Sequence, residues 1–309
     1  MFLKSLFWQV VNSLIKIFLE LFIFNKKIRR ILKGNWAKFY LRKYVRKAVK
    51  SITITPHASP LKDEGKIIWQ YWESSDGSIP PLVQACLNSV EKYKGDKCKR
   101  ILLTPENVKD YADIPQIFWD LKESGKIKTA FFSDILRTCL LIQHGGIWID
   151  STVLLTEELP SYITDTNLFV FQNDLKIDLD GLNMASYFIA AKKDNKILKE
   201  TLAALIQYWK ENRFLVNYFT FLHTFTMVTQ SSKENKELFL KVPFFNFLPV
   251  QQFQGELLNQ FSQERWDEIK KISGIHKLTH KQSVLTKKKE IDTAGTFYEY
   301  IIKEYYNEV

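Results

Sequence analysis

The sequence predicts an α/β domain preceded by a helical arm. From Lys66 onward, short apolar runs of strand type alternate with stretches of helical periodicity, and this order is typical of α/β domains. Residues 1–50 instead carry two helical patterns and the whole excess of positive charge. With 46% hydrophobic and 25% charged residues, the 309-residue chain has the composition of a globular protein. We therefore expect an arm and linker over residues 1–62 and one folded domain over residues 63–309.

Charge separates the arm from the domain. Residues 1–50 contain 13 Lys and Arg against a single acid, Glu20, a net charge of +12, whereas the remaining residues carry 31 basic and 33 acidic groups. A protein that binds nucleic acid through its folded body would show basic groups over that body. The segregated charge favours an arm that meets an anionic membrane surface, and it argues against nucleic acid as a partner.

The first helical pattern, Phe2 to Phe24, is apolar except for a narrow polar stripe. A membrane-spanning helix would place Lys16 and Glu20 in the hydrocarbon at about 2.5–3.5 kcal/mol each. A helix that lies in the membrane interface keeps both charges in water, and the absence of a small-residue cleavage site disfavours a signal peptide. The second pattern, Asn25 to Lys50, is a basic amphipathic helix, and its alternative is a helix packed on the domain with solvated lysines. Ile52 to Gly65 reads as a linker.

The elements of the domain follow in order. Apolar and aromatic runs predict strands, and 3.6-residue periodicity predicts helices between them. The expected strands are Lys66–Trp72, Arg100–Leu103, Ile147–Ile149, Leu168–Gln172 and Tyr187–Ala191; the expected helices are Leu82–Tyr93, Ser133–Ile142, Asn195–Trp209 and Phe297–Tyr306.

The stretch Phe131 to Val153 organises the domain. Ser133 is a plausible N-cap, and Asp134 and Arg137 then share the first turns of a helix with an apolar face. Gly145 and Gly146 end that helix and lead into a short apolar strand that is followed directly by Asp150. An acid at the carboxyl end of a buried strand lies where open α/β sheets bind a metal or a sugar. The alternatives are a solvated helix ion pair and a turn residue.

These residues resemble the signature of the capsular-polysaccharide-synthesis glycosyltransferases, relatives of the sugar transferases that carry a DXD motif. The signature runs S-D-x-x-R, a spacer, G-G, an apolar strand, then D. This chain matches it at Ser133, Asp134, Arg137, Gly145, Gly146, Trp148 and Asp150, and departs from the wider superfamily at Thr152, where a second Asp would complete the DXD. The family's opening x-Q-x-W is matched by Gln70 and Trp72. The resemblance implies a glycosyltransferase A-type domain with a mixed central sheet.

It also implies a reaction: transfer of a sugar from a nucleotide-sugar, a UDP-sugar, to a lipid-linked polysaccharide repeat unit of a capsule or exopolysaccharide, with retention of configuration. The basic arm and its apolar helix predict peripheral attachment at the cytoplasmic face of the cell membrane. The resemblance implies a divalent metal, Mn²⁺ or Mg²⁺. The alternative is a catalytically inactive membrane-bound scaffold, suggested by Thr152.

The resemblance also assigns roles to single residues. Asp134 and Arg137 would hold sugar hydroxyls, and Asp150 the metal or the ribose. Gln70 belongs to the donor-binding strand, and Trp72 would pack on the uracil, with Trp69 as its alternative. In the loop Ser273 to Lys281, His276 would bind the metal and Lys277 the departing diphosphate. By composition alone, that loop could equally be a basic surface loop.

The remaining reactive side chains suggest structural roles. Cys86, Cys98 and Cys139 are odd in number and lack metal-binding spacing, so a reduced compartment fits best. Cys139 falls on the apolar face of the organising helix, where we expect a buried thiol. His223 lies in a segment dense in Phe and Tyr and is expected to be a core histidine.

Overall fold

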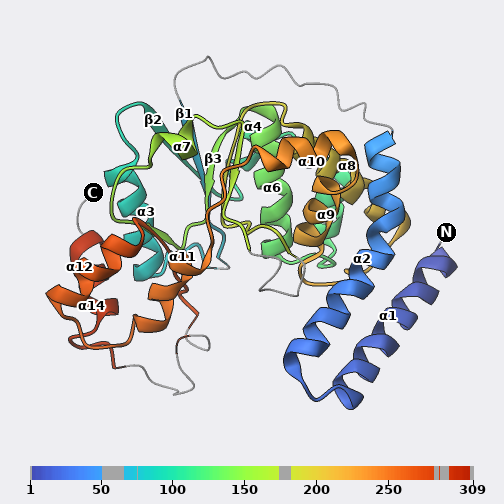
Figure 1. Ribbon diagram of the computed structural model, residues 1–309, viewed down its shortest axis with the longest axis horizontal. Coiled ribbons are helices and arrows are strands. Elements are labelled where there is room, and N and C mark those ends of the chain that lie inside the picture. Colours follow the sequence, from blue (N-terminus) through green and yellow to red (C-terminus); the bar gives the residue numbers. More distant parts are fainter. Residues whose placement is uncertain are drawn as a thin grey trace.

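The computed structural model describes residues 2–50, 66–74, 76–173, 182–281, 285 and 292–306. The expected linker Ile52–Gly65 lies outside the described residues. A five-stranded sheet in the order β2-β1-β3-β6-β5 forms the centre (Figure 1). The strands are β1 (Lys66–Tyr71), β2 (Cys98–Leu103), β3 (Gly146–Ile149), β5 (Leu168–Val170) and β6 (Phe188–Ala191). β1 pairs parallel with β2 and β3, whereas β6 pairs antiparallel with β3 and β5. The predicted α/β fold with a mixed central sheet is confirmed.

Alternation along the strands supplies both faces of the sheet with apolar side chains. Trp69 and Trp148 enter one core and Ile68 and Ile147 the other, because successive residues of a strand point to opposite faces. On the first face, α6 (Thr129–Gln143) packs on β1, β3 and β6, and α8 (Lys196–Glu211) and α9 (Thr220–Thr229) pack beyond it. The opposite side carries α3 (Pro81–Tyr93), which contacts the terminal helix α14 (Phe297–Tyr305) (Figure 1).

Short helices connect these elements. They are α4 (Val108–Tyr111), α5 (Gln116–Glu123), α7 (Ser161–Thr164), α10 (Lys233–Leu240), α11 (Leu248–Gln252), the 3₁₀ helix η1 (Phe253–Glu256) and α12 (Gln263–Ile272). A second, two-stranded sheet joins β4 (Val153–Leu155) to β7 (Ile275–Lys277) in antiparallel register. Because β4 follows Asp150 in the sequence, this pairing brings the C-terminal segment back to the end of β3.

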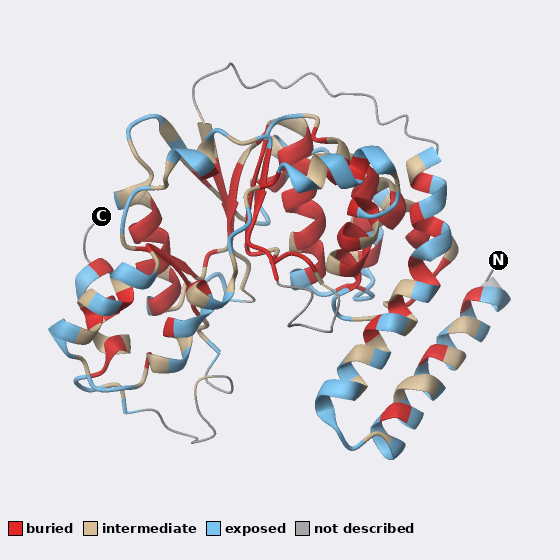
Figure 2. Cartoon of the chain, viewed as in Figure 1, coloured by how far each residue is buried: buried red, intermediate tan, exposed pale blue. Residues whose placement is uncertain are grey.

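The two arm helices differ in how they pack. α2 (Lys26–Lys50) lies against α8 and α9, and its inward face, which includes Tyr40, Leu41 and Tyr44, is buried in the main core (Figure 2). Packing on the domain was the alternative left open for this helix, and most of its lysines and arginines are exposed. The packing of the described residues therefore continues across the expected boundary between the arm and the domain, and the more separate element is α1.

α1 (Phe2–Phe22) packs on α2 through a few side chains only. Ser5, Asn12 and Leu19 are buried, and Trp36 of α2 donates to the Asn12 side chain at 2.9 Å. The rest of α1 is mostly exposed and apolar (Figure 2). By length and composition, Leu3–Phe22 is the one stretch among the described helices that could cross a membrane.

Candidate active site

The segment from α6 to Asp150 folds as the local sequence dictates, with one difference at its start. Gly145 and Gly146 have φ of +71° and +101°, and a Cβ at Gly146 would lie 2.3 Å from the carbonyl oxygen of Ile67. Only glycine therefore allows β3 to start this close to β1. The helix begins at Thr129 rather than after Ser133, so the predicted N-cap role of Ser133 is wrong. Helical periodicity continues through Ser133, which faces Arg137 one turn later.

The Arg137 guanidinium is buried and held from four sides. Nη1 lies 2.9 Å from Asp134 Oδ1 and donates to the Ser186 carbonyl at 2.6 Å. Nη2 donates to Ser133 Oγ at 3.0 Å and to Asp150 Oδ1 at 3.2 Å. Only 5% of the Arg137 side chain is exposed. The Asp134–Arg137 pair is thus not a solvated surface pair, and Arg137 ties the helix to the acid that follows β3.

Asp150 lies between two cations. Besides Arg137, its Oδ1 accepts a hydrogen bond from Trp148 Nε1 at 2.8 Å, and its Oδ2 lies 3.3 Å from Lys277 Nζ. Lys277 Nζ also donates to Thr152 Oγ1. The ammonium group therefore bridges the first and third positions of the Asp150-Ser-Thr152 loop, which correspond to the two acids of a DXD motif.

Burial raises the pKa of both carboxyls and the neighbouring cations lower it, but the net shift differs between Asp150 and Asp134. Burial by itself raises the pKa of Asp150, but Arg137, Lys277 and the Trp148 N–H outweigh it and hold that pKa below its usual range. The pKa of Asp134 is raised to about 6, chiefly by burial and further by repulsion from Asp150, against the attraction of Arg137. Asp150 is therefore ionised at neutral pH, whereas Asp134 titrates in mildly acidic solution.

The structure does not bring His276 to Asp150. Along β7, alternation directs Lys277 towards Asp150 and His276 into the interior, where its ring lies 5.4 Å from the Phe253 ring. His276 is 1% exposed, and burial lowers its pKa to about 4. Its Nε2 lies 3.5 Å from Thr156 Oγ1.

The side chains around Asp150 do not fit the expected Mn²⁺ or Mg²⁺ ion as they lie. Both oxygens of the Asp150 carboxylate already face nitrogen groups, and a second cation beside Lys277 would be repelled. Among the residues that the structure describes, no group of three or more His, Cys, Asp or Glu side chains could hold a metal ion.

The two residues predicted from the first strand lie apart. Trp72 follows β1 half-buried, donates from Nε1 to the Ser78 carbonyl at 2.9 Å, and meets the His280 ring edge-on at 5.2 Å. Trp69, its alternative, is fully buried and donates to the Gly145 carbonyl. Gln70 is also fully buried, and its Oε1 accepts a hydrogen bond from Arg100 Nη1 at 3.4 Å. Of these three side chains, Trp72 is the one that a ligand could reach.

Backbone groups that the sequence did not indicate complete the site. The Ser186 carbonyl accepts from Arg137, and the Tyr187 carbonyl accepts the amide of Asp150 at 2.8 Å. The Tyr187 ring centre lies 5.8 Å from Lys277 Nζ. On the other side, Ser151 Oγ donates to the Tyr71 carbonyl at 2.7 Å, which joins the end of β1 to the Asp150 loop. Every residue has a backbone carbonyl, so no sequence motif could have indicated that Ser186 accepts a hydrogen bond from Arg137.

Comparison with known proteins identifies a family and a sequence relative. A family model described as capsular polysaccharide synthesis protein matches residues 18–301. The O-glycosyltransferase braB of Annulohypoxylon truncatum is 26% identical over 162 residues, which cover 47% of this chain and 38% of that relative.

The solved structures that show a distant similarity to this chain include two glycosyltransferases, each with a TM-score below 0.5. The PaToxG glycosyltransferase has a TM-score of 0.42 at 14% identity, over 69% of this chain and 84% of that one. GlyE of Streptococcus pneumoniae has a TM-score of 0.41 at 12% identity, over 80% of this chain and 61% of that one.

Proposed function

Because the chain belongs to the capsular polysaccharide synthesis protein family, we propose that it is a glycosyltransferase that moves a sugar from a UDP-sugar donor to a lipid-linked oligosaccharide acceptor. The observation that carries this proposal is the convergence of Asp134, Arg137, Asp150 and Lys277 at the carboxyl end of β3. In open α/β sheets, ligands bind in the crevice at that end of the strands. The name of the curated relative supports the reaction class.

The donor would lie across the Asp150 loop. Trp72 offers a half-buried aromatic face for the base, next to the loop that Ser151 ties to β1. Asp150, ionised and 24% exposed, can accept hydrogen bonds from ribose or sugar hydroxyls. Arg137 has its two terminal nitrogens occupied by protein groups, so it acts as a positioning residue that holds the Asp150 carboxylate in place.

Lys277 supplies positive charge for the departing diphosphate. Its ammonium lies between Asp150 and Thr152 and is 21% exposed, so an incoming phosphate can reach it. A fixed cation stabilises the negative charge that develops as the glycosidic bond to the nucleotide breaks. In this proposal the Lys277 ammonium takes the place of the expected divalent metal, because it already occupies the position between the two DXD sites.

The acceptor and the location follow from α1. The exposed apolar side chains of α1 would insert into the cytoplasmic leaflet of the cell membrane. The peripheral enzyme would then meet its lipid-linked acceptor at that surface. Retention of configuration stays a prediction from the family resemblance, and proton NMR of the product linkage distinguishes it from inversion.

The test is UDP release together with product formation on a lipid-linked acceptor, measured with a panel of UDP-sugars. We expect Asp150→Asn to abolish both, whereas Asp110→Asn, which changes an exposed acid of α4, keeps full activity. An inactive scaffold would release no UDP with any donor. Full turnover by Asp150→Asn would show that the reaction takes place elsewhere.

A further inference from the structure

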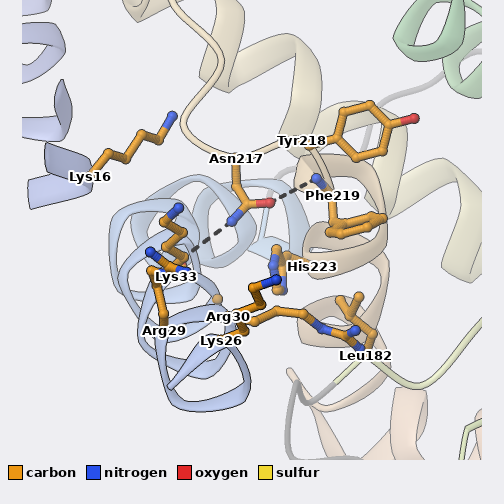
Figure 3. A pocket seen from close by; sticks show the side chains of 11 residues that line it. Lys16, Lys26, Arg29, Arg30, Lys33, Leu182, Asn217, Tyr218, Phe219 and His223 are labelled. Carbon is orange, nitrogen blue, oxygen red and sulfur yellow. Dashed lines mark hydrogen bonds between the residues drawn. The ribbon is translucent and has the colours of Figure 1, made fainter. Parts of the chain in front are cut away.

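A second cluster of basic side chains lines a cavity between the arm and the domain. The cavity has a volume of about 360 Å³, within the range of about 300–1,000 Å³ of ligand pockets (Figure 3). Its basic lining residues are Lys16 of α1 and Lys26, Arg29, Arg30 and Lys33 of α2. Asn217, Tyr218, Phe219 and His223 close it from the domain side. None of the residues that line it is acidic, so the cavity is suited to an anion.

His223 adds a buried polar group to this lining. It is 2% exposed, and its Nδ1 has no hydrogen-bond partner among the described residues. The ring lies among the basic side chains of α2 in Figure 3. Burial lowers the pKa of His223 to about 3, so the ring is neutral and can offer one N–H donor. The expectation of a buried histidine is confirmed, but its free nitrogen is a cost that a bound ligand would remove.

The positive charge of the cavity is only partly balanced by the protein. Glu20 forms ion pairs with Arg29 and Lys33, and it is the one acid in residues 1–50. The pKa of Lys16 is lowered chiefly by burial and further by repulsion from the neighbouring Lys33. An anion with more than one negative charge would relieve this repulsion.

The apolar surface beside the cavity indicates what kind of molecule carries that anion. The turn between α1 and α2 exposes two large apolar side chains, Phe22 at 61% and Phe24 at 88%. Lys26, which lines the cavity, follows Phe24 by two residues. A ligand that satisfies both surfaces has a charged head and an apolar tail. We propose that the cavity binds the phosphate headgroup of a membrane lipid whose acyl chains lie along the exposed apolar side chains of the turn between α1 and α2.

Vesicle co-sedimentation of the full chain tests this proposal. The probe is a phosphatidylcholine vesicle that contains phosphatidic acid, compared with one brought to the same surface charge by phosphatidylserine. We expect tighter binding to phosphatidic acid, because its terminal phosphate carries more charge into the cavity. Lys16→Ala/Lys26→Ala should remove this preference and weaken binding by roughly tenfold, since two charge-assisted contacts are lost.

A matched variant separates the cavity from general surface charge. Lys27→Ala/Arg42→Ala removes the same charge from exposed positions of α2 that do not line the cavity. We expect this variant to bind both vesicles more weakly but to keep the preference for phosphatidic acid. Equal losses in the two double variants would overturn the proposal in favour of nonspecific attraction to an anionic surface.

Inorganic pyrophosphate identifies the source of the phosphate. If a lipid is the ligand, pyrophosphate should raise the melting temperature only slightly, and vesicles should bind in its presence. Strong stabilisation by pyrophosphate that is lost in Lys16→Ala/Lys26→Ala, without any preference among vesicles, would assign the cavity to a soluble phosphate compound and overturn the lipid assignment. UDP release by the same double variant remains normal if only the lipid site is damaged, so these results are independent of the proposed transfer reaction.

Discussion

The Asp150 site and the cavity between the arm and the domain both gather basic side chains, but they balance the charge differently. At the first, Arg137 and Lys277 each lie within 3.3 Å of a carboxylate oxygen. At the second, no acid lines the cavity that Lys16 and Lys26 share. Cations paired within the protein are held in one geometry, which suits a reaction. Cations without such a balance favour an anion from outside.

The largest expected difference between the two clusters is in stability. Arg137→Leu should lower the free energy of unfolding by about 3–5 kcal/mol, because it leaves two carboxylates buried without their shared partner. Lys16→Leu should leave stability unchanged or raise it, because it removes a partly buried charge and its repulsion with Lys33. Urea denaturation of both variants measures this. Similar losses in the two variants would show that the charge of the cavity is balanced after all.

A smaller effect concerns turnover. Lys277→Ala should lower kcat by roughly 10²–10³ with little change in the donor KM, since the cation acts on charge that develops in the transition state. Lys281→Ala, an exposed position in the same segment, is the control and should keep normal kinetics.

Chelation of divalent metals tests whether the Lys277 ammonium takes the place of a metal ion. If the Lys277 ammonium replaces a divalent metal, the wild-type enzyme should keep its rate in EDTA, whereas Mn²⁺ should partly restore Lys277→Ala by entering the vacated position. Wild-type turnover that depends strictly on Mn²⁺ would contradict the role proposed for Lys277.

The smallest effect is a pH dependence of stability at Asp134. Its pKa is about 6 in the folded chain against an ordinary 3.8, so the folded state binds the proton more tightly than the unfolded state. The stability that this gives is full below pH 3.8 and is lost as the pH rises to about 6. Asp134→Asn should lack this loss. Melting temperatures of both proteins between pH 4 and 7 test it, and parallel curves would mean that Asp134 is ionised throughout.

Local patterns in the sequence were sufficient for the elements that surround the site. The run before Trp72, the periodicity of α6, and the turn at Gly145 and Gly146 each depend on neighbours within a few residues, and the structure has β1, α6 and β3 there. The position of Asp150 after β3 follows from that order. The buried states of Cys139 and His223 were likewise readable from the apolar residues around them.

Contacts between distant segments decided the rest. Lys277 meets Asp150 across 127 positions, and the alternation of β7 that directs His276 away from it appears only once β7 pairs with β4. The packing of α2 on α8 and α9 could not be told from membrane contact, because an amphipathic helix buries the same face in either. The cavity likewise forms where α1, α2 and the segment before α9 meet. The sequence shows that residues 1–50 are basic, but it does not show which of these basic side chains come together.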